Sequence, residues 1–255
     1  MKLSPIAVQL YTVREALAND FTGVVKKIAE FGYLGVETAN FPGTTPKQAA
    51  QLFKDLGLTV CSAHAPLPIG PQKNEVLDLA ATLNCSRVIC PALDRAYYSR
   101  VDQVHRACDL INEANQVAIE NGLSLGVHNH WWEYEPVEDQ YPYEIMMERL
   151  DPSVFMEIDV YWVRVAGFNP VEIVEEWGQR APLLHIKDGT ALPGLPHLAV
   201  GEGIIDIAGV IEAGKGVTEW LIVELDECET DMLEAVEDSY TYLVGSSLAR
   251  GRKLV

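Results

Sequence analysis

Acidic and imidazole side chains follow directly on several apolar runs that are typical of buried strands. The run at residues 123–127 ends in His128, Asn129 and His130, and Glu133 comes three residues later. The same arrangement recurs in the next three apolar runs, at Asp159, at His185 with Lys187, and at Glu224. Buried polar groups are costly unless they are satisfied. Their repetition at four successive strand ends therefore indicates a functional site.

Imidazole nitrogens and carboxylate oxygens together form a hard ligand set. It suits Mn²⁺, Mg²⁺, Co²⁺ or catalytic Zn²⁺ better than it suits a cysteine-rich structural zinc site. Such a cation can bind adjacent oxygens of a hydroxy-carbonyl compound and stabilise the enediolate left when a proton is removed next to the carbonyl. A carboxylate would act as the base and a second group would return the proton, each contributing about 10²–10⁴-fold. Lys187 could hold a substrate oxygen or a phosphate.

Eight apolar strands, each followed by a helix, account for the spacing of these residues. We expect the strands at residues 6–10, 34–37, 59–63, 87–90, 123–128, 154–159, 183–187 and 221–225. Most are continuously apolar, as parallel strands covered on both faces should be. Eight βα units, without a Gly-x-Gly-x-x-Gly turn after the first strand, favour a closed (β/α)₈ TIM barrel over an open doubly wound sheet. We expect a single domain over residues 1–255.

Capping residues mark several of the intervening helices. The pattern predicts helices at residues 20–31, 46–56, 72–83, 101–121, 170–177, 205–213 and 231–248, with a short helix after Pro142. Asp20 and Thr45 are expected N-caps. Gly57 and Gly122 follow helix ends, where a residue with positive φ commonly closes the last turn.

In a TIM barrel the active site lies at the C-terminal ends of the strands. Because side chains two residues apart share one face of a strand, four pairs should point the same way: His128 with His130, Glu157 with Asp159, His185 with Lys187, and Glu224 with Asp226. Earlier strands add Glu37 and His64, for which a purely structural role is an equal alternative to substrate contact. Trp162 follows a strand end and could pack against the rim or contact a sugar.

Composition narrows the class of protein. The net charge of −18 and the lack of a basic stripe argue against nucleic-acid binding. Five cysteines without a CxxC pair fit reduced thiols. The sequence has no signal-peptide pattern and no apolar run of the roughly 18 residues expected for a membrane span. We therefore expect a cytoplasmic protein that contacts no membrane.

Five segments, at residues 127–133, 158–162, 185–189, 200–206 and 222–227, resemble the sugar phosphate isomerase/epimerase family. Glu37 and the His-Ala-Pro stretch at 64–66 also fit, so the resemblance spans essentially the whole chain. It implies a xylose-isomerase-like TIM barrel and a divalent metal held by residues from strands five to eight. Carried over by position, Asp159, His185 and Glu224 are metal ligands.

The fourth ligand is less direct, because many relatives carry a glutamate where this chain has His128. Either His128 takes that place or Glu133 folds back to fill it. We assign Glu133, since a second negative ligand balances the charge of the ion. The remaining assignments are His128, His130, Lys187 and Glu224 to catalysis, and Glu37, His64 and Trp162 to substrate binding.

The resemblance implies a metal-dependent isomerase or epimerase acting on a sugar, sugar phosphate or related keto-polyol, and a possible homodimer. A dehydratase or lyase acting on a keto-sugar or keto-inositol is the alternative, because the same enolate can expel a β-hydroxyl. Metal-dependent endonucleases acting on abasic DNA share the barrel, but the acidic composition disfavours that activity. A non-catalytic sugar-binding barrel would bind ligand without exchanging its protons.

Overall fold

Eight parallel strands form a closed barrel in the computed structural model, which describes residues 3–192 and 194–252. The barrel strands are β1 (Ile6–Gln9), β2 (Gly35–Thr38), β3 (Thr59–His64), β4 (Arg87–Cys90), β5 (Ser124–His128), β6 (Phe155–Asp159), β7 (Leu183–Ile186) and β10 (Trp220–Val223). They follow the order β1-β10-β7-β6-β5-β4-β3-β2 around the barrel. The predicted (β/α)₈ fold and the positions of all eight strands are confirmed.

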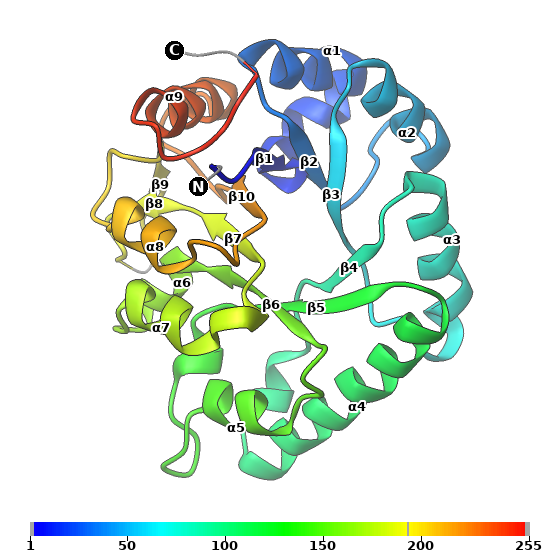
Figure 1. Cartoon of the computed structure of the whole chain (residues 1–255), viewed down its shortest axis with the longest axis vertical. Coiled ribbons are helices and arrows are strands. Elements are labelled where there is room, and N and C mark those ends of the chain that lie inside the picture. The colour runs from blue at the N-terminus through cyan, green and yellow to red at the C-terminus, as the bar shows by residue number, and fades with distance from the viewer. Residues whose placement is uncertain (1–2, 193, 253–255) are drawn as a thin grey trace.

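Helices surround the barrel (Figure 1). They are α1 (Arg14–Phe31), α2 (Pro46–Asp55), α3 (Lys73–Leu83), α4 (Val101–Glu120), α5 (Pro142–Arg149), α6 (Val160–Val165), α7 (Pro170–Trp177), α8 (Ile207–Ala213) and α9 (Met232–Gly245). Short 3₁₀ turns are η1 (Leu10–Val13), η2 (Gly70–Gln72), η3 (Arg95–Tyr98), η4 (Trp132–Tyr134) and η5 (Gly178–Arg180). Within the described ranges, none of the helices combines the length and the apolar character needed to cross a membrane.

The capping residues behave as expected, with one difference in α1. Thr45 accepts a hydrogen bond from the backbone N–H of Gln48, and Gly57 has a φ of 64°. Asp20 lies inside α1 rather than before it. Its backbone departs from helical geometry (φ −151°, ψ 83°), and its carboxylate accepts the N–H of Gly23 at 2.8 Å. Asp20 therefore caps the second part of a broken helix, and the first part, from Arg14, was not predicted.

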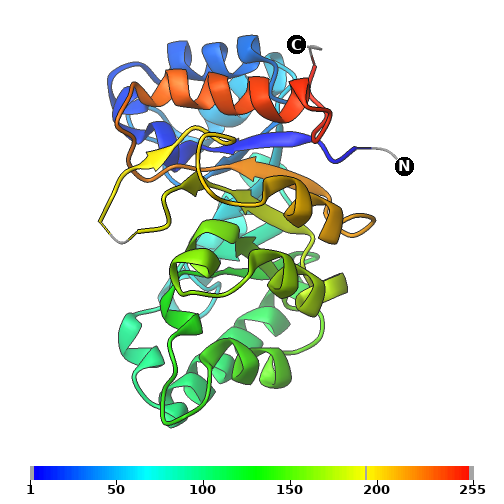
Figure 2. The same cartoon turned by 90° about the vertical axis from the view of Figure 1, so that its left-hand side faces the viewer.

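Three short elements were also missed. Helix α6 follows β6 without a loop, and its six residues are too few to show a helical period. The segment after β7 forms a two-stranded antiparallel pair, β8 (Asp188–Gly189) with β9 (His197–Leu198). Figure 2 shows this pair, in yellow, on the side of the molecule opposite the N-terminus. Each of these two strands has only two residues, too few to show a strand period in the sequence.

The barrel interior has an apolar floor that is separate from the core between strands and helices. Its buried members come from six strands: Ala7, Cys61, Ile89, Phe155, Leu183 and Ile222. Gly126 leaves room for one of them, since a Cβ there would lie 2.3 Å from the Phe155 ring. The polar side chains of the candidate site lie beyond this floor, toward the C-terminal ends of the strands.

Candidate active site

Strand parity places the polar residues directly above the apolar floor. Counting two residues on from Phe155, Leu183 and Ile222 gives Glu157, His185 and Glu224, which must face the same interior. Counting four gives Asp159 and Lys187 on β6 and just after β7. All five are buried. The pairs that sequence parity predicted on these three strands are confirmed in space.

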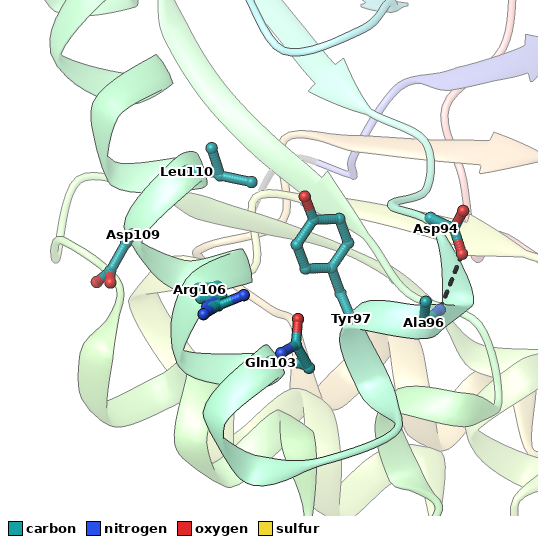
Figure 3. A pocket seen from close by; sticks show the side chains of 7 residues that line it. All are labelled: Asp94, Ala96, Tyr97, Gln103, Arg106, Asp109 and Leu110. Atoms are coloured by element: carbon teal, nitrogen blue, oxygen red, sulfur yellow. Dashed lines mark hydrogen bonds between the residues drawn. The ribbon is translucent and has the colours of Figure 1, made fainter.

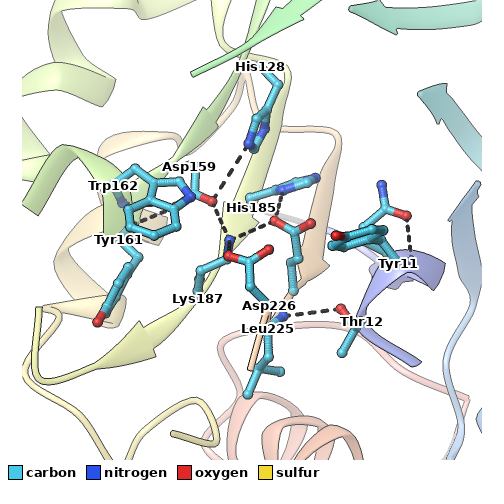
Figure 4. A network of polar contacts seen from close by, with 12 residues as sticks. Tyr11, Thr12, His128, Asp159, Tyr161, Trp162, His185, Lys187, Leu225 and Asp226 are labelled. Carbon is cyan, nitrogen blue, oxygen red and sulfur yellow. Dashed lines mark hydrogen bonds and ion pairs between the residues drawn. The ribbon is translucent and has the colours of Figure 1, made fainter. Parts of the chain in front are cut away.

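Four side chains from four adjacent strands converge at the barrel mouth. They are His128, Asp159, His185 and Glu224, and each offers a ligand atom within 4.8 Å of the others. Figure 4 shows the contact between His128 and Asp159, with His185 beside them. Asp159 is oriented by its role as the N-cap of α6, where Oδ1 accepts the N–H groups of Tyr161 and Trp162. Its other oxygen, Oδ2, is left to face the mouth.

A second group lies deeper and shares two members with the first. His64, His128, Glu157 and His185 also offer ligand atoms within 4.8 Å of one another. His64 Nε2 lies 2.7 Å from Glu157 Oε2. His185 Nε2 lies 2.6 Å from Glu37 Oε1, which also accepts a hydrogen bond from the Gln9 side chain.

Glu157 is the residue of this group that sequence reasoning left without a role. Its Oε2 lies 3.1 Å from His185 Nε2 and 3.3 Å from His128 Nδ1, in addition to its contact with His64. The available signal was its parity with Asp159 on the same strand. What the sequence did not show is that three imidazoles meet this one carboxylate.

Lys187 Nζ lies between three carboxylates. It is 2.9 Å from Asp159 Oδ2, 2.9 Å from Glu224 Oε2 and 2.9 Å from Asp226 Oδ2. It also lies 5.1 Å from the centre of the Trp162 ring. Burial by itself lowers the pKa of Lys187, but the three carboxylates outweigh burial and hold that pKa well above its usual value. Lys187 is therefore a fixed positive charge.

The protonation states of the other groups follow from burial and their neighbours. Burial, with the charge of Glu157 added, raises the pKa of Glu37 to about 7. Burial also favours a neutral Glu224, yet Lys187 and His185 hold its pKa well below the usual range. Burial lowers the pKa of His128. The mouth thus combines an ionised carboxylate at Glu224 with a neutral imidazole at His128.

The structure separates Glu133 from the two groups of ligand atoms. Its Oε2 accepts the backbone N–H of His130 at 2.9 Å, and Glu133 belongs to neither group of mutually close atoms. His128 occupies the strand-five position in both groups. Of the two alternatives for the fourth ligand, the geometry therefore favours His128, because η4 turns the Glu133 carboxylate back onto the chain that precedes it.

His130 and Trp162 lie at the rim. The His130 ring stacks on Trp132, with centroids 4.1 Å apart, and burial lowers its pKa to about 2. Both His130 and Trp162 line the pocket that opens above the four converging side chains. Trp131 contacts Trp162, with ring centres 4.9 Å apart. Part of the aromatic rim therefore faces the pocket and part is packing, and contact of Trp162 with a sugar stays a prediction.

This pocket has a volume of about 590 Å³, in the range of small-molecule sites. It is lined by Tyr11, Ala39, Asn40, His64, Ala65, Pro66, Pro91, Ala92, His128, His130, Trp162, Lys187, Glu224 and Asp226. His64 contributes to the lining, whereas Glu37 lies below it and reaches the site through His185 and His64. A direct contact between Glu37 and substrate therefore has less support than its alternative, a supporting role.

Asp188 fixes the segment that passes beside the mouth. Its buried carboxylate accepts four backbone N–H groups, from Gly189, Gly201, Gly203 and Ile205, at 2.8–3.1 Å. A Cβ at position 203 would lie 2.0 Å from Asp188 Oδ1, so this close approach requires glycine. The segment at residues 201–205 is thus anchored next to the end of β7.

Another pocket, of about 540 Å³, opens between η3 and α4 (Figure 3). Its lining comprises Asp94, Ala96, Tyr97, Gln103, Arg106, Asp109 and Leu110. Its carboxylates belong to no group of mutually close metal-ligating atoms in the described part of the chain. The chemistry-bearing residues therefore gather at the barrel mouth.

The residues at the mouth fit a divalent cation. Two deeply buried oxygens, Glu37 Oε2 and Glu157 Oε1, have no hydrogen-bond partner among the described residues. Unsatisfied buried carboxylate oxygens are costly, and a nearby cation would lower that cost. The four converging side chains also provide the mixed nitrogen and oxygen donors that Mn²⁺, Co²⁺ and catalytic Zn²⁺ accept.

A comparison with family models shows to which protein family the chain belongs. The family model described as xylose isomerase-like TIM barrel matches residues 25–242. The chain belongs to this family. A search of curated proteins found no significant match.

Several solved structures share the fold over nearly the whole chain. A sugar phosphate isomerase/epimerase from Parabacteroides distasonis shares 22% identity and a TM-score of 0.81, over 99% of this chain and 96% of that one. An L-ribulose 3-epimerase shares 14% identity and a TM-score of 0.66, over 96% and 95%. A probable 3-DHS dehydratase from Bacillus anthracis shares 12% identity and a TM-score of 0.75, over 94% and 98%. At these identities the likeness concerns the fold.

Proposed function

We propose that this protein is a divalent-metal-dependent isomerase or epimerase of a sugar or related keto-polyol. The observation that carries the proposal is the convergence of His128, Asp159, His185 and Glu224 beneath a pocket of small-molecule size. Family membership supports it independently. Both L-ribulose 3-epimerase and the sugar phosphate isomerase/epimerase share the barrel on which these residues stand.

These four side chains would hold the cation. When bound, a divalent ion supplies positive charge next to the substrate oxygens, where negative charge develops as a proton leaves the adjacent carbon. The fourth position is His128 rather than the glutamate that many relatives carry. With one fewer negative ligand, the neighbouring Glu157 and Lys187 set the remaining charge balance of the site.

Glu224 is the proposed base. Its low pKa leaves it ionised at neutral pH, so its carboxylate can accept a proton from the substrate carbon. His130 is the proposed second proton-transfer group, since it lines the pocket, belongs to neither group of candidate ligands and has a neutral imidazole that can accept or return a proton. Glu157 Oε2 lies 3.3 Å from His128 Nδ1 and would orient that ring. Lys187, whose ammonium contacts Asp159, Glu224 and Asp226, would fix the positions and the charge of these carboxylates.

A dehydratase would use the same base, because removal of the proton is common to both reactions and only the fate of the β-hydroxyl differs. The fold is shared with a probable dehydratase as well as with epimerases. Analysis of products by NMR distinguishes the two activities. A rearranged ketose identifies the isomerase or epimerase, and loss of water identifies the alternative.

Incorporation of solvent deuterium tests the proposal. Protein loaded with Mn²⁺ is incubated in D₂O with a panel of ketoses, and NMR follows exchange at the carbons next to the carbonyl. We expect exchange by the wild type and a loss of about 10²-fold or more in Glu224→Gln. The matched control is Glu227→Gln, an exposed carboxylate nearby. Mn²⁺ binding by each variant is measured in parallel, so that loss of the base is separated from loss of the cation.

Wild-type protein that binds no divalent cation and exchanges no ketose would contradict the proposal. Glu224→Gln protein that exchanges at the wild-type rate would contradict the role of Glu224 while leaving the function intact.

A further inference from the structure

Most of the side chains that line the pocket above the candidate ligands carry no charge. The lining includes three imidazoles and the charged residues Lys187, Glu224 and Asp226. The other lining residues are Tyr11, Ala39, Asn40, Ala65, Pro66, Pro91, Ala92 and Trp162. Only Tyr11, Asn40 and the Trp162 indole bring polar groups, and none of these carries a charge at neutral pH. A substrate that extends from the candidate ligands toward solvent would therefore contact these uncharged side chains.

Lys187 is the one lysine or arginine among the lining residues in the part of the chain that the structure describes. Its ammonium is already in contact with Asp159, Glu224 and Asp226, each at 2.9 Å (Figure 4). Asp159 and Glu224 are also candidate ligands of the cation, so Asp226 is the carboxylate beside Lys187 that a bound cation would leave to face an anionic substrate. An anionic group on the substrate would have to displace these carboxylates from Lys187.

The nearby arginines point to other partners. Arg14 does not line the pocket, and its guanidinium donates to the backbone carbonyls of Tyr11 and Asp226, at 3.1 and 2.8 Å. Arg95 pairs with Glu135 at 3.0 Å, outside the lining.

Of the three lining imidazoles, His128 belongs to both groups of candidate ligands, and His130 stacks on Trp132. His64 Nε2 lies 2.7 Å from Glu157 Oε2 and 3.2 Å from Glu37 Oε1, so two buried carboxylates already engage it.

We propose that the site selects an uncharged ketose or keto-polyol and rejects substrates that carry a phosphate or carboxylate away from the reacting carbons. This inference rests on the proposed function, since it names the substrate class of the same site. Phosphate recognition in proteins uses arginine forks, free lysines or backbone N–H groups. The lining offers a lysine that is already paired with carboxylates, and Asp226 adds a carboxylate that belongs to neither group of candidate ligands. Juxtaposed like charges strongly disfavour a partner.

The test compares an uncharged ketose with its own phosphate ester. Protein is loaded with Mn²⁺, and free cation is removed by gel filtration. D-fructose and D-fructose 6-phosphate, together with other ketoses available as such pairs, are assayed for deuterium exchange and titrated calorimetrically. For the pair that reacts, we expect the uncharged sugar to exceed its ester by at least about 100-fold in kcat/KM and to bind more tightly.

A charge-gain variant sharpens the test. Asn40 is exposed and lines the pocket, so Asn40→Lys adds a free cation without disturbing the core. We expect this variant to reduce the discrimination against the ester by about tenfold or more, whereas the matched control Asn40→Gln leaves it unchanged.

Deuterium exchange tests the proposed function, and calorimetric titration tests the selection for an uncharged substrate. Absence of exchange with every ketose counts against the proposed function, and the titrations then decide the charge selection by themselves. Tighter binding of the uncharged sugar supports the inference. Binding of the ester at least as tight as that of the uncharged sugar, or binding of neither member of any pair, overturns it.

Discussion

Removal of the Lys187 ammonium should destabilise the metal-free protein substantially. In Lys187→Met, Asp159 Oδ2 loses its 2.9 Å ion pair, and its next basic neighbour is His128 Nε2 at 3.9 Å. Glu224 retains His185 Nδ1 at 2.8 Å, and Asp226 is partly exposed to water. Most of the cost therefore falls on Asp159. Breaking one partner of a buried ion pair typically costs about 3–5 kcal/mol.

The assay is chemical denaturation in EDTA, followed by thermal unfolding. A loss of about 3–5 kcal/mol corresponds to a decrease in Tm of about 6–20 °C for a chain of this size. The matched control is Lys215→Met, which removes an exposed pair with Glu212 at 2.8 Å and should change the free energy of unfolding by less than about 1 kcal/mol. Addition of Mn²⁺ at about 100 times its Kd should restore about 2.7 kcal/mol to Lys187→Met.

Loss of less than 1 kcal/mol by Lys187→Met in EDTA would refute the reasoning. It would mean that the three carboxylates do not depend on Lys187 for their charge balance. A failure of Mn²⁺ to stabilise the variant would instead count against a cation bound by Asp159 and Glu224.

Three further predictions address the ligands, the pH dependence and the rim. His128→Ala and Asp159→Asn should each weaken Mn²⁺ binding in calorimetry by at least about 10–100-fold, whereas Glu133→Gln should not; the reverse result would restore Glu133 as the ligand. Because burial raises the pKa of Glu133 to about 7, the folded state binds more protons than the unfolded state between about pH 4.5 and 7, and its stability falls as pH rises through that window. Glu133→Gln should remove up to about 3 kcal/mol of this pH dependence, measured from denaturation midpoints at several pH values, and parallel profiles would exclude the effect. Asp188→Asn should weaken the anchoring of residues 190–205 and make that segment more sensitive to limited proteolysis, with a loss of about 1–3 kcal/mol in unfolding; unchanged cleavage would show that the four N–H contacts are dispensable.

Local chemistry made much of the fold predictable. Thr45 with its following proline, and Gly57 after the helix, are signals read within a few residues, and the structure confirms them. The broken start of α1 was missed because Asp20 carries a strong N-cap signal, which concealed the helical turns before it. Elements of two residues, such as β8 and β9, are too short to leave such a signal.

The Glu133 assignment shows where sequence reasoning about the site reaches its limit. Charge balance favoured a carboxylate ligand, and Glu133 was the nearest one in sequence. In the structure the turn η4 brings the Glu133 carboxylate onto the backbone N–H of His130, and this geometry favours the alternative, His128. Tertiary packing determines how the chain turns after β5, and the amino-acid sequence does not show the direction of that turn.

The sequence by itself determined which side chains face the barrel interior, because alternation along each strand fixes a face once the apolar floor is known. It therefore identified Asp159, His185, Lys187 and Glu224. Only the tertiary structure decided which of these groups meet across the barrel. His185 contacts Glu37, 148 residues away, and Lys187 contacts three carboxylates at once. Closure of β1 against β10 brings these strand ends within bonding distance, and that closure is a property of the whole chain.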